Sequence, residues 1–128
     1  MFSLAFRRVP RRFKRRFLSG INRLLILAVL GSSSVPIHGY QIAKVIRILS
    51  KGKISINMST VYAVLRDMEK NGLARSVWRK SPLGPPRRCY IITELGSNLL
   101  ADVVAYLKAI VRIAEQQKYG LRGHGLGS

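Results

Sequence analysis

The segment Pro36–Thr93 reads PIHGYQIAKVIRILSKGKISINMSTVYAVLRDMEKNGLARSVWRKSPLGPPRRCYIIT. Hydrophobic residues recur three and four positions apart over Tyr40–Leu49 and again over Met58–Lys70, which is the spacing of a helix with one buried face. The residues after Gly72 alternate nearly enough between hydrophobic and polar to be typical of strands. The segment therefore predicts two short amphipathic helices followed by a two-stranded hairpin.

Both predicted helices have a hydrophobic stripe and recognisable ends. Asn57 can cap the second helix, and Ile56 can pack on Val61 as a hydrophobic staple. Gly52 and the pair Asn71-Gly72 are suited to end the two helices in a left-handed conformation. The buried stripes are predicted to be Ile42, Val45, Ile46 and Leu49 in the first helix, and Val61, Val64, Leu65 and Met68 in the second.

The second helix also has a polar outer face. At about 100° per residue, this face consists of Ser59, Ala63, Arg66 and Lys70, flanked by Thr60 and Tyr62. Such side chains fit a DNA groove, although an ordinary solvated helix face has the same composition.

The predicted hairpin has strands at Arg75–Lys80 and Arg88–Ile92. Between them, we expect a loop stiffened by Pro82, Gly84, Pro85 and Pro86 and edged by Lys80, Arg87 and Arg88. A stiff loop loses little entropy when it presents cations to a phosphate backbone. Trp78 is expected to pack within the hairpin.

Two further helices are expected on either side of this segment. Leu24–Leu30 is apolar on all sides and predicts a buried first helix. Thr93 is a candidate cap for a long helix to about Gln117, with a coiled-coil seam of Leu100, Val103, Leu107, Ile110 and Ala114. Because a helix this apolar needs cover, we expect it to pack on a partner subunit as well as on its own chain.

The N-terminal residues 1–23 form a basic arm without any acidic residue. Pro10 is expected to interrupt any long helix, with at most a short helix after it that carries Phe13 and Phe17. The arm fits a solvated tail or a segment that follows phosphates. It also resembles an export signal, but Arg23 abuts the apolar run and no small-residue cleavage site follows. The resulting division is 1–23 arm, 24–93 nucleic-acid-binding domain, 94–117 C-terminal helix and 118–128 flexible tail.

Composition favours a nucleic-acid partner over catalysis. The chain has 23 Lys plus Arg against 5 Asp plus Glu, a formal charge of +18 over 128 residues. Its single cysteine, Cys89, excludes an internal disulfide and suits a reducing cytoplasm, and a packed, inert thiol is expected. His38 and His124 have no metal-ligand spacing, and we expect a structural hydrogen bond at His38. The sequence therefore predicts no enzyme activity, no metal, no cofactor and no membrane span.

A helix pair followed by a basic hairpin is the plan of a winged helix-turn-helix. The fold class predicted is mainly α, with a small β-hairpin wing and a long C-terminal dimerisation helix. Two functions fit it: a sequence-specific transcriptional regulator, and an architectural or ribosome-associated protein that binds nucleic acid without reading bases. Both would act in the cytoplasm on a nucleic-acid partner.

Four short motifs in register over Leu24–Ala114 resemble the PadR family of transcriptional regulators. They are Pro36-Ile37-His38-Gly39-Tyr40, Thr60-Val61-Tyr62-x-x-Leu65, Glu69-x-x-Gly72-Leu73 and Gly84-Pro85-Pro86-Arg87-Arg88-Cys89-Tyr90-x-x-Thr93-x-x-Gly96. Asn57-Met58-Ser59 stands where many members have Ser-Pro-Gly, and Cys89 replaces an aromatic residue. The resemblance covers no part of the basic arm.

The resemblance implies a winged-helix repressor that binds a palindromic operator in double-stranded DNA as a homodimer joined through its first and last helices. Some relatives sense aromatic effectors, but no residue here identifies a ligand. The implied recognition helix is Met58–Lys70 and the implied wing is Lys80–Arg88. The DNA-contacting residues expected are Tyr40, Ser59, Thr60, Tyr62, Arg66, Lys70, Lys80, Arg87 and Arg88, and the dimerisation residues are Leu27, Leu100, Val103, Leu107 and Ile110.

Overall fold

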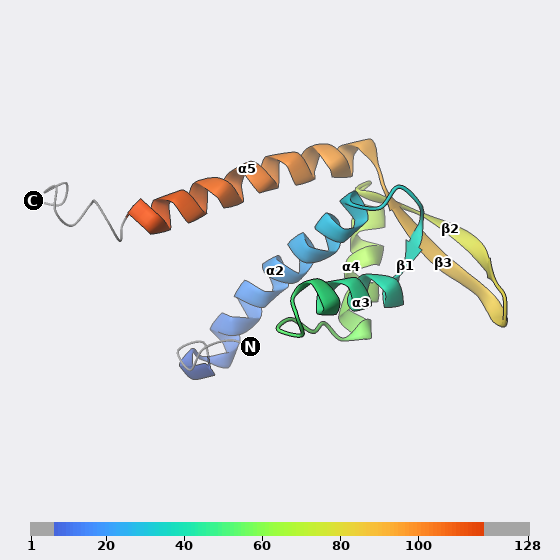
Figure 1. Cartoon of the computed structure of the whole chain (residues 1–128), viewed down its shortest axis with the longest axis horizontal. Coiled ribbons are helices and arrows are strands. Elements are labelled where there is room, and N and C mark those ends of the chain that lie inside the picture. Colours follow the sequence, from blue (N-terminus) through green and yellow to red (C-terminus); the bar gives the residue numbers. More distant parts are fainter. Residues whose placement is uncertain (1–6, 117–128) are drawn as a thin grey trace, which may run out of the picture.

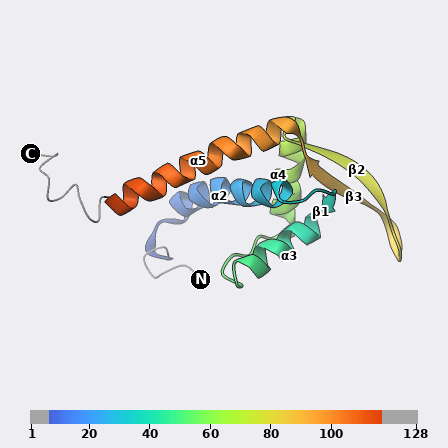
Figure 2. The ribbon, with the colours of Figure 1, turned by 45° about the horizontal axis from the view of Figure 1, so that its top comes forward.

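The computed structural model describes residues 7–116 and shows a helical body with a small sheet at one side (Figure 1). The last helix leaves the sheet beside the first helix, and the two diverge toward their far ends (Figures 1 and 2). The elements are α2 (Arg11–Gly31), β1 (Ile37–His38), α3 (Gly39–Leu49), α4 (Met58–Lys70), β2 (Ala74–Ser81), β3 (Gly84–Ile92) and α5 (Glu94–Gln116). The predicted fold class, a winged helix-turn-helix with a long C-terminal helix, is confirmed.

The sheet is antiparallel, with strand order β1-β3-β2. The short strand β1 pairs with β3 at Ile37↔Tyr90 and His38↔Cys89. The hairpin pairs Trp78↔Arg88 and Arg79↔Arg87 before an irregularity that precedes Ser81↔Gly84. Because side chains alternate along a strand, Arg87 and Arg88 point to opposite faces of the sheet.

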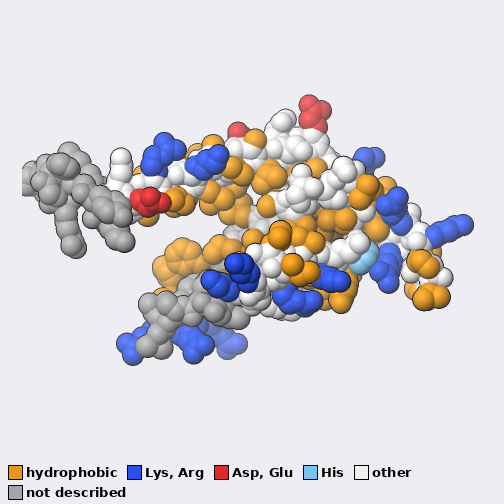
Figure 3. All heavy atoms as spheres, in the orientation of Figure 1, with side chains coloured by type: hydrophobic (Ala, Val, Ile, Leu, Met, Phe, Trp, Pro, Cys, Tyr) orange, Lys and Arg blue, Asp and Glu red, His pale blue; other side chains and the backbone are white. Residues whose placement is uncertain are grey.

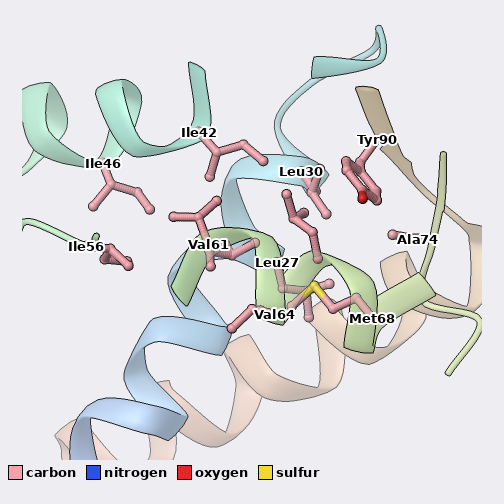
Figure 4. Close-up of a cluster of buried hydrophobic side chains, with 12 residues drawn as sticks. Leu27, Leu30, Ile42, Ile46, Ile56, Val61, Val64, Met68, Ala74 and Tyr90 are labelled. Atoms are coloured by element: carbon pink, nitrogen blue, oxygen red, sulfur yellow. The ribbon is translucent and has the colours of Figure 1, made fainter. Parts of the chain in front are cut away.

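The core lies where α2, α3, α4 and the base of the hairpin meet (Figure 4). Its most completely buried side chains are Ile26, Leu30, Ile42, Val61, Leu65 and Tyr90. The predicted stripe of α4 is confirmed, since all four of its members are buried. Two expectations need correction. Leu49 is 77% exposed, and Leu27, at 3% exposed, lies in the core of its own chain instead of on a surface open to a partner.

The helix after Pro10 is much longer than expected. Pro10 separates α2 from the helical residues 7–8, as predicted, but α2 then runs for 21 residues instead of forming a short helix. Proline suits this position because it lacks an N–H that the first turn would leave unpaired in any case. The basic residues from Arg11 to Arg23 are thus helical, and the boundary drawn between residues 23 and 24 falls inside α2.

The hairpin is also longer than expected, and the predicted proline loop is wrong. Only Pro82 and Leu83 lie between the strands, whereas Pro85 and Pro86 belong to β3. Proline is tolerated in strands at irregularities and at open edges. Both conditions hold here, because the register is irregular between Arg79 and Ser81 and β1 pairs with β3 only at positions 89 and 90.

The predicted helix caps are confirmed. Asn57 Oδ1 accepts a hydrogen bond from the Thr60 N–H at 2.9 Å. Thr93 Oγ1 accepts one from the Gly96 N–H at 3.1 Å at the start of α5, and its hydroxyl donates to the Gly72 carbonyl at 2.6 Å. Thr93 therefore ties the start of α5 to the end of α4. The expected helix end at Gln117 and the expected tail 118–128 lie outside the described residues.

Candidate nucleic-acid interface

The outer face of α4 is polar and exposed. Ser59, Ala63, Arg66 and Lys70 all face solvent, while the opposite stripe is held in the core. The Ser59 hydroxyl donates to Asn57 Oδ1 at 2.8 Å, so its proton is engaged in the cap and its lone pairs face outward. Rigid attachment to the core and a polar outer face are what a helix needs to enter a DNA groove.

Tyr62 joins α4 to the start of α3. Its ring lies so close to Gly39 that a Cβ at that position would approach Tyr62 Cε1 to 2.8 Å. Residue 39 must therefore be glycine for this ring to keep its place. Tyr62 is still 37% exposed and Tyr40 is 57% exposed, so both rings reach the surface.

A surface hollow of about 480 Å³ lies between the start of α3, helix α4 and strand β3. It is lined by His38, Tyr40, Tyr62, Arg87 and Arg88. Phenol hydroxyls and guanidinium groups are donors for phosphate oxygens. The hollow thus gathers four of the nine residues that the sequence predicted to contact DNA. It also contains His38, which was not among those nine.

His38 connects the wing to the start of α3. Its Nδ1 accepts the Gln41 N–H at 3.3 Å and caps α3, while the Gln41 side chain accepts the His38 N–H at 3.1 Å. Nη1 of Arg87 lies 2.9 Å from Nε2. Burial, and then the positive charge of Arg87, lower the pKa of His38. The structural hydrogen bond expected at His38 is confirmed, and its contact with Arg87 is an addition.

Arg88 fixes the wing to α4. Its Nη2 lies 2.8 Å from Glu69 Oε1, and its guanidinium lies over the Tyr90 ring at 5.8 Å. The other carboxylate oxygen of Glu69 accepts hydrogen bonds from the hydroxyl and the N–H of Ser76 in β2. The Ser76 hydroxyl, and to a lesser degree the charge of Arg88, lower the pKa of Glu69. Arg88 was expected to face phosphate at a loop edge, but it is engaged in this ion pair while its side chain stays 42% exposed.

The outer part of the wing carries further cations. A second hollow, of about 620 Å³, is lined by Lys80, Arg79 and Arg87 together with β1 residues and Trp78. Trp78 is 69% exposed, so the expected packing role is wrong. Its indole lines this hollow instead of being covered by the strands.

The predicted site residues therefore fall into three groups. Ser59 and Thr60 lie at the N-terminal end of α4, Arg66 and Lys70 lie further along it, and the hollow with Arg87 and Arg88 leads to the wing with Lys80. Sequence reasoning missed Glu69. The spacing His38-x-x-Gln41, which matches a capping box, could have indicated the role of His38.

The predicted dimerisation residues differ in exposure. Leu100 packs partly against the core, and Val103 is half-buried. Leu107 is 41% exposed and Ile110 is 57% exposed, further out along α5. Facing sides of α2 and α5 show hydrophobic side chains (Figure 3). On α2, Phe13 and Phe17 are about half exposed, with ring centroids 5.0 Å apart.

Within residues 7–116, no three His, Cys, Asp or Glu side chains are grouped as metal ligands would be. None of the helices in the same range has both the length and the hydropathy required to cross a membrane. Cys89 is buried, at 4% exposed, as a packed thiol is expected to be.

Comparison with known proteins places this geometry in context. Residues 26–102 match a family model described as the transcriptional regulator PadR-like family. A PadR-family transcriptional regulator from Eggerthella lenta is 24% identical with a TM-score of 0.69, and the match covers 92% of this chain and 99% of that one. A PadR-like regulator from Bacillus cereus is 21% identical over 82% and 98% of the two chains, with a TM-score of 0.67. A transcriptional regulator from Clostridium thermocellum is 24% identical over 79% and 93%, with a TM-score of 0.69. Curated protein sequences give no match.

Proposed function

Because the chain belongs to the PadR-like family of transcriptional regulators, we propose that it is a repressor that binds a palindromic operator in double-stranded DNA as a homodimer. The observation that carries this proposal is the pairing of an exposed polar face on α4 with a cationic wing. Both belong to one rigid unit, because Arg88 and Ser76 of the hairpin contact Glu69 of α4. A rigid unit loses little entropy when it docks on DNA.

In the proposed complex, α4 lies in the major groove and the hollow beside it receives a phosphate. Arg66 and Lys70 are long enough to reach base edges or the far backbone, and Ser59 and Thr60 lie at the leading end of the helix. Tyr40, Tyr62 and Arg87 line the hollow and have donors for phosphate oxygens. Lys80 extends this cationic surface along the wing toward its tip.

The proposed dimer is supported by the apolar faces of α2 and α5. Where the helices touch, a Cβ on Gly31 would meet Leu100. By helical periodicity, the face of α5 that holds Leu100 continues outward as Leu107 and Ile110, which are exposed. The corresponding face of α2 continues as exposed Phe17 and Phe13. A second copy could cover both faces, and a two-fold axis would match a palindromic operator.

The decisive experiment compares two DNA affinities at one salt concentration. The purified protein is titrated onto duplexes from the region upstream of its own gene and onto random duplexes of equal length, with its mass measured by light scattering. A repressor should prefer one upstream duplex by about 10³-fold or more. An architectural protein would bind both equally, because its phosphate contacts are independent of sequence. Sequencing the DNA bound in cells then gives the operator.

A further inference from the structure

A cationic groove lies between the N-terminal half of α2 and the turn that leads into α4. Its volume is about 760 Å³. One wall comes from α2, with Arg11 one helical turn from the adjacent Lys14 and Arg15; the other comes from the residues before α4, including Lys53. The first of these walls precedes the region of the chain that matches the family model, which begins at residue 26.

The groove is strongly positive. Its lining includes five cationic side chains and no Asp or Glu, the cations being Arg11, Lys14, Arg15, Arg23 and Lys53. Arg23 has an acidic neighbour, Asp67, at 3.8 Å, but both side chains are about half exposed. An exposed pair at this distance contributes little. The groove therefore attracts anions, and four of its five cations are held on the helix α2.

The groove also adjoins the recognition helix. Asn57 and Thr60, which form the cap of α4, belong to its lining. An anion bound there would lie beside the end of α4 that we propose to enter the major groove. Lys and Arg side chains gather over the N-terminal half of α2 and again over the wing, on the two sides of the α3 and α4 region (Figure 3).

We infer that this groove binds the phosphate backbone of DNA just outside the operator, so that the N-terminal half of α2 is a second DNA-contacting element. The inference rests on the proposed function. The reach of the groove supports it: at 1.5 Å per residue, Arg11 and Arg23 are about 18 Å apart along α2. About five phosphates of one strand fall within that length of the duplex axis, at about 3.4 Å each. A row of cations of this length suits an extended polyanion better than a single small anion.

The same helix provides a matched pair of variants. Arg11→Gln/Arg15→Gln removes two cations from the groove, whereas Arg12→Gln/Arg16→Gln removes two from positions that do not line it. Both pairs have the same spacing, the same change in net charge and residues of good helix propensity. Each protein is titrated onto two duplexes, one that ends at the operator and one extended by about 10 base pairs, or one helical turn, on each side.

The expected result is specific to one variant and one duplex. The groove variant should lose about tenfold in affinity on the extended duplex at low salt. The slope of log affinity against log salt concentration should fall in magnitude by about two, because each lost phosphate contact lowers it by about 0.9. It should bind the short duplex almost as the wild type does. The control variant should lose less on both duplexes and keep the wild-type slope.

Three outcomes would overturn the inference. The first is equal losses in both variants, because net charge alone would then explain the effect. The second is a wild-type affinity that does not depend on duplex length. The third is loss of binding to vesicles of anionic lipid without loss on DNA, which would assign the groove to a membrane surface. If wild-type protein prefers no duplex, the proposed function fails instead, and that result differs from all three.

Discussion

Replacing Glu69 with Gln should loosen the wing from α4. Glu69 holds two residues of the hairpin: Arg88 by an ion pair of 2.8 Å, and Ser76 by two hydrogen bonds. Glutamine keeps the size and can still accept from Ser76, but it loses the charge that strengthens both contacts. The variant therefore tests the charge of Glu69 and not the packing around it.

The size of the effect follows from exposure. The side chains of the ion pair are 42% and 29% exposed, and a pair this open to water contributes about 0–1 kcal/mol. The hydrogen bond from the Ser76 hydroxyl is part-buried, and replacing a charged acceptor with a neutral one halves its strength, at a cost of about 1 kcal/mol. We expect Glu69→Gln to lower the free energy of unfolding by about 1–2 kcal/mol.

The effect should depend on pH in a defined direction. The pKa of Glu69 is lowered in the folded chain from the ordinary value of 4.5. Its contribution to stability is therefore fully present above about pH 4.5 and is lost as the pH falls through the lowered pKa. The stability difference between wild type and Glu69→Gln should be largest at pH 7 and should shrink toward pH 3.

Urea denaturation at pH 7, 5 and 3.5 measures this difference, with Asp102→Asn as a control that removes one negative charge from an exposed position on α5. A double-mutant cycle with Arg88→Gln isolates the ion pair, for which we expect a coupling of about 0.5–1 kcal/mol. A difference that stays the same from pH 7 to 3.5, together with zero coupling, would refute the role of Glu69 as the anchor of the wing.

If the exposed side chain of Arg66 meets a base edge, Arg66→Ala should weaken operator binding by about 1–3 kcal/mol and random-duplex binding by much less. Fluorescence anisotropy measures both affinities, and equal losses would make Arg66 a phosphate contact. Leu107→Glu should give a folded monomer in light scattering. The position is 41% exposed in one chain, so the chain still folds, but the proposed dimer would bury the charge at a cost of about 3–5 kcal/mol. Gly96→Ala should lower the free energy of unfolding by about 1–3 kcal/mol in urea denaturation. The Cβ of the alanine would meet the backbone oxygen of Leu73, which cannot move aside, and unchanged stability would contradict this packing. Arg87→Gln should raise the pKa of His38 in an NMR titration, since the charge of Arg87 contributes to lowering it, and an unchanged pKa would mean that burial alone is responsible.

The parts of the fold that the sequence predicted best are those fixed by local interactions. The bounds of α4 follow from the Asn57 cap, the stripe begun by Val61 and the Gly72 stop, all within one short segment. The prolines of the hairpin misled because their effect depends on neighbours. Pro85 belongs to β3 and lies beside an open strand edge, and this context is not local information.

The candidate site was predicted by residue type but not by arrangement. Its cations and phenols were identified from the face of a helix and from a basic hairpin. The contacts that organise them join distant residues: His38 to Arg87, and Glu69 to Arg88, which are 49 and 19 positions apart. Periodicity carries no information about such pairs. The groove beside α2 was missed for a second reason, since it exists only because the basic arm is helical.

Opposite orientation of two neighbouring arginines limits how this hairpin can change its length. Arg87 faces His38 and Arg88 faces Glu69 because side chains alternate along β3. Insertion or deletion of a single residue between this pair and Tyr90 would exchange the two faces, and each arginine would then point at the wrong partner. Changes beyond Arg87 toward the tip leave the positions of both arginines unchanged and keep both contacts. The reach of the wing can thus vary at its tip without disturbing its attachment.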